Sequence, residues 1–169
     1  MKRVLIIISI IIFIIISNKE YEKIVIPENA IRVRVVANSN NLDDQLLKIK
    51  VKNKITENLS KKLENVTTLE EARNNIKNNL VEIEKIVSTT LNNDNYEINF
   101  GNNYFPKKNL NGINYKEGNY ESLVINIGKS QGNNWWCVLF PPLCMIETKY
   151  EETNEVEYKS KILEILNRY

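Results

Sequence analysis

The chain has 169 residues, enough for one compact domain with short appendages but too few for two domains of ordinary size. Its 23 basic and 21 acidic side chains nearly balance, so no strong charge field points to nucleic acid or to an acidic substrate. The complete absence of histidine excludes a histidine base and histidine-ligated zinc. We therefore expect a protein that is not an enzyme and that holds no metal or cofactor.

The first 17 residues have the pattern of an export signal. Lys2 and Arg3 precede an apolar run over residues 4–16, which only Ser9 interrupts. As a helix this run would span roughly 20 Å, which is short against a hydrocarbon layer of roughly 30 Å. No pair of small residues marks a cleavage site, so the pattern leaves open whether the segment is removed or kept as a short membrane anchor. In both cases the rest of the chain crosses the membrane.

A polar tether over residues 18–29 leads into the first predicted strand. Residues 31–37, IRVRVVA, alternate between apolar and polar or small side chains with a period of two. The apolar residues therefore lie on one face of the strand, and Arg32 and Arg34 lie on the other.

Two amphipathic helices are predicted next, because apolar residues recur every three or four positions over 47–63 and again over 69–91. Asp43 and Asp44 fall in the first turn of the first helix, where a capping role is favoured over acid–base catalysis. Residues 67–71, TTLEE, form a capping-box sequence before the second helix. We expect the second helix to run antiparallel to the first and to pack on a sheet with it, which is favoured over coiled-coil dimerisation.

Three further strands are predicted at residues 96–100, 122–127 and 135–140. The connection 104–118 has no readable pattern, and the glycines of residues 128–132 predict a hairpin loop. The element order is β-α-α-β-β-β. It predicts an α+β fold with a small mixed sheet of about four strands and two long helices packed on one face.

Residues 30–147 are expected to form this domain, and residues 148–169 a charged, helical tail. The tail places four apolar or aromatic residues on one helical face. These residues are Tyr158, Ile162, Ile165 and Tyr169.

The most unusual stretch of the chain is NNWWCVLFPPLC at residues 133–144. It resembles the corresponding stretch of the stage II sporulation protein R family, and three other segments are similar to that family as well. These are IRVRVVANSN at 31–40 with Asp44-Gln45 after it, EGNYESL at 117–123, and the turn Ile127-Gly128. The resemblance covers residues 31–146 in register and does not extend into the tail.

The resemblance implies an exported signalling protein of endospore formation. Proteins of that family are made in the forespore and exported into the intermembrane space. There they activate a membrane-embedded aspartic protease, which removes the inhibitory pro-sequence of sigma-E. The resemblance thus implies a sporulation protease as partner and no chemistry by the protein itself. We expect membrane contact through the N-terminal segment, and neither nucleic acid nor a small-molecule substrate as a partner.

Adjacent strand residues face opposite sides, so Trp135 and Trp136 cannot both lie under the helices. The strand 135–140 is apolar on both faces, with Trp135, Cys137 and Leu139 on one side and Trp136, Val138 and Phe140 on the other. We hypothesise that the surplus apolar surface, beside the arginines of the first strand, contacts the partner, since Trp and Arg dominate many binding energies. The candidate residues are Arg32, Arg34, Asn134, Trp135, Trp136 and Phe140. The alternative is that the connection 104–118 or the C-terminal helix covers this face.

Cys137 and Cys144 suggest a disulfide in an exported protein, which would contribute about 2–3 kcal/mol, although two buried thiols also fit. A catalytic thiol has no histidine to activate it. Two other functions are weighed against signalling. A hydrolase would need a carboxylate pair, or a Ser–Lys dyad such as Ser130 with Lys129, and the latter pair is more typical of a turn. A cell-wall or membrane-surface binding module would use exposed aromatic residues, but no basic patch or repeat supports it.

Overall fold

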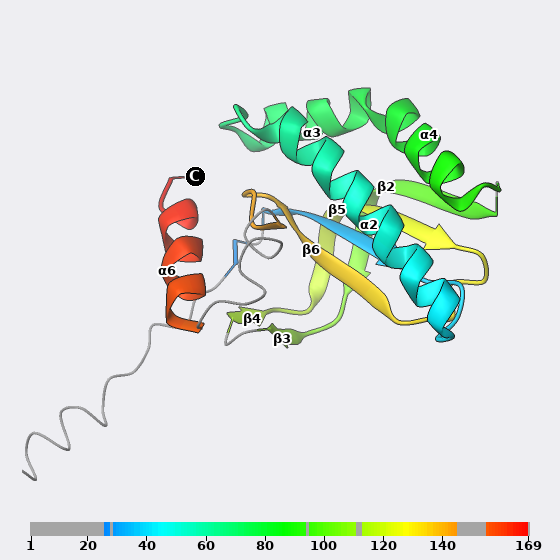
Figure 1. The fold of residues 1–169 in the computed structure, drawn as a ribbon. Coiled ribbons are helices and arrows are strands. Elements are labelled where there is room, and N and C mark those ends of the chain that lie inside the picture. Colours follow the sequence, from blue (N-terminus) through cyan, green and yellow to red (C-terminus); the bar gives the residue numbers. More distant parts are fainter. Residues whose placement is uncertain (1–25, 28, 94, 111–112, 145–154, 169) are drawn as a thin grey trace, which may run out of the picture.

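A computed structural model describes residues 26–27, 29–93, 95–110, 113–144 and 155–168. The signal-like segment and most of the tether lie outside these residues. The described part is an α+β fold, as predicted, with a mixed four-stranded sheet and three helices on one face (Figure 1). The elements are β1 (Ile31–Val36), α2 (Leu42–Leu63), α3 (Leu69–Asn78), α4 (Leu80–Leu91), β2 (Tyr96–Phe105), β3 (Lys108–Leu110), β4 (Ile113–Tyr115), β5 (Gly118–Ile127), β6 (Asn134–Phe140) and α6 (Glu155–Leu166).

The strand order in the sheet is β2-β5-β1-β6. Strand β1 pairs with β5 in parallel and with β6 antiparallel, and β2 pairs antiparallel with β5. The prediction of a hairpin loop at residues 128–132 is therefore wrong, because β1 lies between the two strands that this loop connects. Two glycines in a short connection mark a sharp change of direction, but they do not determine which strand becomes the neighbour.

The connection 128–132 crosses the end of β1 in close contact with it. The backbone N–H of Gly132 donates to the carbonyl of Ala37 at 2.9 Å, and that of Gln131 donates to the carbonyl of Asn38 at 3.1 Å. A Cβ atom on Gly132 would overlap the carbonyl oxygen of Ser39. The glycine is thus required by the close approach of two backbones.

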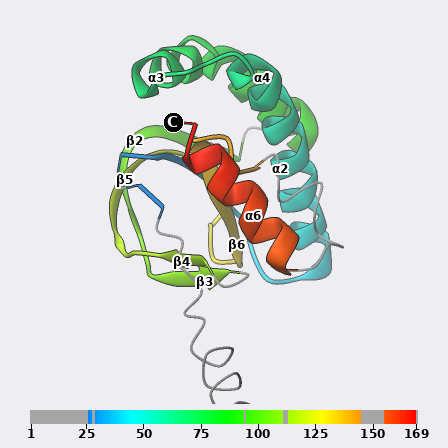
Figure 2. The ribbon, with the colours of Figure 1, turned by 90° about the vertical axis from the view of Figure 1, so that its left-hand side faces the viewer.

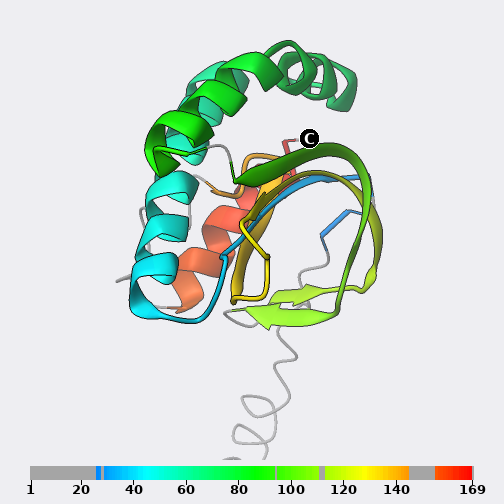
Figure 3. The same cartoon turned by 90° about the vertical axis from the view of Figure 1, so that its right-hand side faces the viewer.

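The segment 104–118, which the sequence left unreadable, extends β2 and β5 and ends in a small hairpin. Strands β2 and β5 pair over ten residues each, and β3 pairs with β4 beyond their ends. The long pair curves, so that β3 and β4 come to lie beneath the face of the sheet opposite the helices (Figure 3).

The second predicted helix is broken at Asn79 into α3 and α4. Asn79 has φ −97° and ψ 0°, outside the helical range, and its side-chain amide donates to the carbonyl of Asn75 at 2.8 Å. An asparagine bonds readily to nearby backbone groups and so competes with helix continuation. The predicted capping box before α3 is confirmed, with Thr68 and Glu71 bonding each other's backbone N–H groups.

Two apolar clusters lie on the two faces of the sheet. The larger one fills the space between the sheet and helices α2, α3 and α4, where most of the apolar helical positions predicted from the sequence are buried. It includes Val33, Val35, Val51, Ile55, Leu59, Ile76, Ile83, Val87, Leu123 and Ile125. The second cluster covers the opposite face and consists of Ile26, Ala30, Phe105, Tyr115, Tyr120, Trp136, Val138, Leu143 and Ile162.

The second cluster resolves the alternative that the sequence left open for this face. Phe105 and Tyr115 come from the 104–118 segment, and Ile162 comes from α6, so both of the segments considered contribute to the cover (Figure 2). Ile165 of the predicted tail face is partly buried against the same cluster. The side chains of Tyr158 and Tyr169 lie outside the described part of the chain.

Helix α2 begins at a network of polar residues that follows β1. Asn41 caps the helix by accepting from the N–H of Asp44 at 2.8 Å. The Asp44 carboxylate in turn accepts from the Ser39 hydroxyl at 2.6 Å and from the Asn38 amide at 2.8 Å. These two hydrogen bonds lower the pKa of Asp44, and the bond from Ser39 has the larger effect. The network agrees with a structural role for the Asp44 carboxylate at the start of α2, and not with a role in acid–base catalysis.

Candidate partner-binding site

Strand β6 is an edge strand that presents its two tryptophans to different environments. In register, Trp136 lies opposite Arg34 and Trp135 lies opposite Val35. Trp136 is 4% exposed and belongs to the second cluster, whereas Trp135 packs at the margin of the larger cluster and is half-buried. The expected separation of the two rings by the alternation of the strand is thus observed.

A bulge changes the side of the sheet on which Phe140 lies. The pairing shifts between Ile31 and Arg32, which lie opposite Phe140 and Val138 respectively, so Leu139 is an additional residue on β6. Leu139 and Phe140 therefore both join the larger cluster under the helices. The predicted grouping of Phe140 with Trp136 on one face is wrong, because strict alternation does not hold across a bulge.

The Trp136 side of β6 is closed by an aromatic box around Arg32. The guanidinium carbon of Arg32 lies 3.4 Å from the centroid of the Tyr120 ring, and 5.1, 5.3 and 5.9 Å from those of Trp136, Phe105 and Tyr115. The rings of Phe105 and Tyr115 meet that of Trp136 edge to face. All five side chains are buried, so this face of the strand is an interior layer.

Arg32 is fully buried, and its three guanidinium nitrogens have no hydrogen-bond partner among the residues that the structure describes. Burial lowers its pKa from the ordinary value, and Tyr120 opposes that shift. The aromatic faces supply the electrostatic stabilisation that a carboxylate would otherwise give. Arg34 lies at the edge of the box, 4.8 Å above the Phe105 ring, and donates to the carbonyl of Tyr104 at 3.1 Å.

The Trp135 side of β6 opens on a groove between this strand and the N-terminal half of α2. The groove has a volume of about 390 Å³, and we call it the α2–β6 groove. It is lined by Lys48, Ile49, Lys52, Asn53, Asn134 and Trp135. The Lys52 ammonium lies 5.1 Å from the centroid of the Trp135 ring. An aromatic wall with cationic groups beside it suits a partner that carries both apolar and acidic side chains.

The predicted partner-binding residues divide between these two environments. Trp135 and Asn134 line the groove, and Asn134 is exposed. Arg32, Trp136 and Phe140 are buried, so a partner has no access to them in this conformation. Arg34 is half-buried at the edge of the aromatic box. The partner-binding role itself stays a prediction, and only the accessible residues carry it further.

Four residues of the groove, all from α2, were not among the predicted site residues. Lys48, Ile49, Lys52 and Asn53 have the spacing of a helix face, and the lysines were indistinguishable in sequence from a solvated surface. A signal was present in Leu46 and Ile49, two apolar residues outside the main apolar face of the helix. They are 47% and 45% exposed, which marks an apolar surface that the fold does not use internally.

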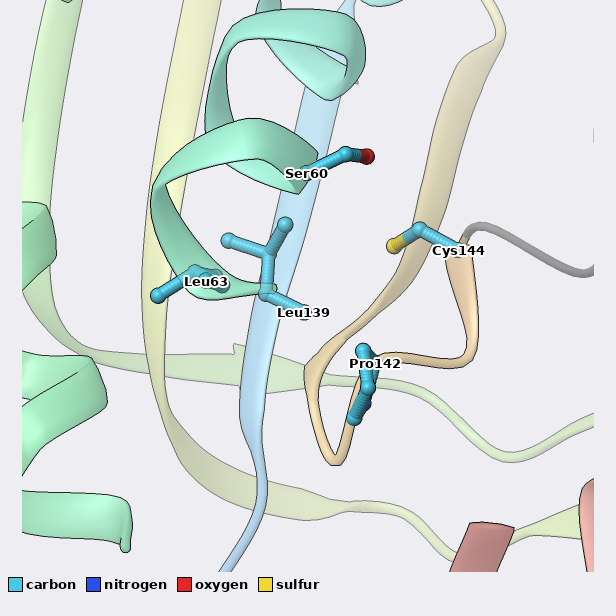
Figure 4. A pocket seen from close by; sticks show the side chains of 5 residues that line it. All are labelled: Ser60, Leu63, Leu139, Pro142 and Cys144. Carbon is cyan, nitrogen blue, oxygen red and sulfur yellow. The ribbon is translucent and has the colours of Figure 1, made fainter. Parts of the chain in front are cut away.

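The side chains of Cys137 and Cys144 are both buried in this structure. The carbonyl oxygen of Val138 accepts from Cys144 Sγ at 3.0 Å and lies 3.7 Å from Cys137 Sγ. Cys144 faces a cavity of about 10 Å³, which is lined by Ser60, Leu63, Leu139, Pro142 and Cys144 (Figure 4). The chain doubles back at the prolines, as the predicted disulfide requires. The pairing stays a prediction, which a mass measurement with and without alkylation would test.

In the described part of the chain, no group of three or more Cys, Asp or Glu side chains could hold a metal ion. None of the helices described is long and apolar enough to span a bilayer. The apolar run 4–16 lies outside the residues to which this statement applies.

Comparison with known proteins agrees with the resemblance noted in the sequence. A family model described as stage II sporulation protein R matches residues 27–150. The chain is also 35% identical over 160 residues to stage II sporulation protein R of Bacillus subtilis (strain 168), and the alignment covers 88% of this chain and 71% of that protein. No solved structure gives a significant match. By the extent of both matches, the chain belongs to the stage II sporulation protein R family.

Proposed function

We propose that the protein is an exported signal of endospore formation, which activates a membrane-embedded aspartic protease and thereby causes the processing of pro-sigma-E. The observation that carries the proposal is the family match over residues 27–150, which spans the whole sheet and its helices. The basic residues and apolar run at the N-terminus support export from the compartment of synthesis. The protein then acts in the intermembrane space, with the segment 1–17 either removed or retained as an anchor.

Activation of this kind requires binding and no chemistry by the activator. A ligand shifts an equilibrium between inactive and active forms only by the difference between its affinities for them. A tenfold preference for the active form corresponds to about 1.4 kcal/mol, which a few well-placed contacts supply. The accessible α2–β6 groove, with Trp135 in its wall, is the surface of the described residues that suits such contacts best.

The proposal is tested by co-expression in a host that does not sporulate. The protease and its pro-sigma-E substrate are produced with the full-length chain, with a form that lacks residues 1–17, or with neither. We expect processed sigma-E only with the exported, full-length chain. Processing without this chain, or equal processing by the form retained in the cytoplasm, would contradict the proposal. Retention of the protein on purified sacculi without any processing would favour the cell-wall binding alternative.

A further inference from the structure

The α2–β6 groove combines an aromatic wall, an exposed apolar helix edge and a set of lysines. We propose that this groove is the site at which the partner docks, and that it takes an acidic segment of the partner protein whose apolar side chain packs between Trp135 and Ile49. The inference rests on the proposed function, because the partner is the protease that the protein activates.

The apolar part of this surface is larger than the groove alone. Leu42, Leu46 and Ile49 are 73%, 47% and 45% exposed, and their spacing places them on one line along α2. Asn53 continues the same line and lines the groove next to Ile49. Large apolar side chains that are grouped on a surface, rather than scattered, mark interaction sites. The groove volume of about 390 Å³ is also within the range of about 300–1,000 Å³ that binding pockets occupy.

The charged part of the surface has one sign. Lys48 and Lys52 line the groove, and the pKa of Lys48 is lowered first by burial and then by the charge of Lys108. Lys108 of β3 lies outside the groove, with its ammonium 5.0 Å from the centroid of the buried Trp136 ring. Among the described residues no carboxylate forms an ion pair with any of the three lysines. Lys48 instead donates to the side-chain oxygen of Gln45 at 2.7 Å and to the carbonyl of Asn133 at 3.1 Å. An incoming carboxylate would therefore meet cationic groups that are already positioned.

This arrangement favours a protein segment over a lipid surface or a second copy of the chain. Lys48 and Lys52 are buried at 7% and 8% exposure, so their ammonium groups are recessed in the groove, whereas contact with a flat anionic membrane requires projecting lysines. A symmetric dimer through this surface would bring the same lysines face to face, which costs energy. A narrow acidic segment satisfies both the shape and the charge.

The test uses the co-expression system with four variants of the full-length chain. Ile49→Glu and Asn53→Glu change exposed positions that line the groove. Val81→Glu is the control for the first, since Val81 is an exposed apolar residue of α4, at 79% exposure, and does not line the groove. Lys54→Glu is the control for the second, because it alters the net charge more than Asn53→Glu does but lies outside the groove on α2. Thermal unfolding of each purified variant verifies that it folds.

We expect Ile49→Glu and Asn53→Glu to slow pro-sigma-E processing about tenfold or more, as at a central interface position, and both controls to act as wild type. Folded groove variants that process as fast as wild type would overturn the inference and leave the proposed function intact. Absence of processing with the wild-type chain would overturn the proposed function, and the inference with it.

Two further measurements distinguish a partner segment in the groove from a lipid or a second copy of the chain. If wild-type protein binds phosphatidylglycerol vesicles and the two groove variants do not, while processing is unchanged, the groove is a lipid site and the inference is wrong. If sedimentation velocity shows a dimer that only the groove variants lose, again with unchanged processing, the groove is a self-association surface. The inference predicts neither result.

Discussion

The guanidinium of Arg32 stacks on the ring of Tyr120, with 3.4 Å between its central carbon and the ring centroid. The contact joins β1 to β5 on the face opposite the helices, where Trp136 of β6 completes the cover. A residue that looks like a surface arginine in the sequence is thus a core residue of the second cluster. Because Arg32 and Trp136 lie together in this cluster, the Trp136 face of β6 is interior, and only the Trp135 face is accessible.

The energetic role of Arg32 is tested by substitutions that keep or remove its volume. Arg32→Met retains most of the side-chain volume and removes a buried charge, so its free energy of unfolding should stay within about 1 kcal/mol of wild type. Arg32→Ala leaves a cavity among four aromatic rings and should cost about 2–4 kcal/mol. Urea unfolding measures both. If Arg32→Met were as damaging as Arg32→Ala, the charge itself would be required, and the packing account would be wrong.

The two tryptophans of β6 should respond differently to truncation. Trp136→Ala removes a ring that contacts Phe105, Tyr115 and Arg32, so it should lower the free energy of unfolding by about 3–5 kcal/mol. Trp135→Ala affects a half-buried ring at the groove and should cost about 1 kcal/mol or less. Chemical denaturation of both proteins under the same conditions makes the comparison. Equal losses would contradict the assignment of an interior and an accessible face.

The carboxylate of Asp44 predicts a pH dependence of stability. Hydrogen bonds from Ser39 and Asn38 lower the pKa of Asp44 in the folded protein from its ordinary value of 3.8. The charged carboxylate therefore stabilises the fold at pH values above this ordinary pKa. This contribution is lost as the pH falls through the lowered pKa and the group is protonated. Asp44→Asn should therefore be less stable than wild type at pH 7, and the difference should shrink below about pH 4. Urea midpoints from pH 7 to pH 3 test this, and a constant difference would contradict it.

Substitution by alanine should be tolerated less well at Gly132, in the connection 128–132, than at Gly101 in β2. Gly132→Ala places a Cβ against the carbonyl oxygen of Ser39 and should cost about 1–3 kcal/mol. Gly101→Ala, in β2, brings its Cβ no closer than 3.5 Å to Asn99 Oδ1 and should change stability by less than about 0.5 kcal/mol. The thermal midpoints of both variants provide the readout. Tolerance of alanine at Gly132 would show that the two backbones are less close than described.

Much of the local structure was predictable, because apolar periodicity reports burial directly. The period of two over residues 31–37 identified β1 and its buried face, and the spacing from Leu47 to Leu63 identified α2. The capping box at Thr68 is observed, whereas the cap of α2 is Asn41, and Asp44 in the first turn accepts from the side chains of Asn38 and Ser39. Each of these features depends only on residues that are near one another in the chain.

Features that depend on distant contacts were not predictable in the same way. The insertion of β1 between β5 and β6 follows from a parallel pairing that no local pattern specifies. The extension of β2 and β5 was hidden because asparagine and glycine residues interrupt the apolar pattern over residues 101–118. The site was predicted in part: Trp135 and Asn134 are accessible, but their neighbours Lys48 and Lys52 depend on how α2 packs beside β6.

Docking of the protease at the α2–β6 groove is tested most directly by photo-crosslinking in cells that contain the protease. A benzophenone amino acid is introduced at Ile49, in the groove, or at Val81, an exposed apolar position of α4 outside it. We predict a crosslink to the protease from position 49 and none from position 81 on irradiation. A crosslink from position 81 alone, or equal crosslinks from both, would contradict docking at the α2–β6 groove.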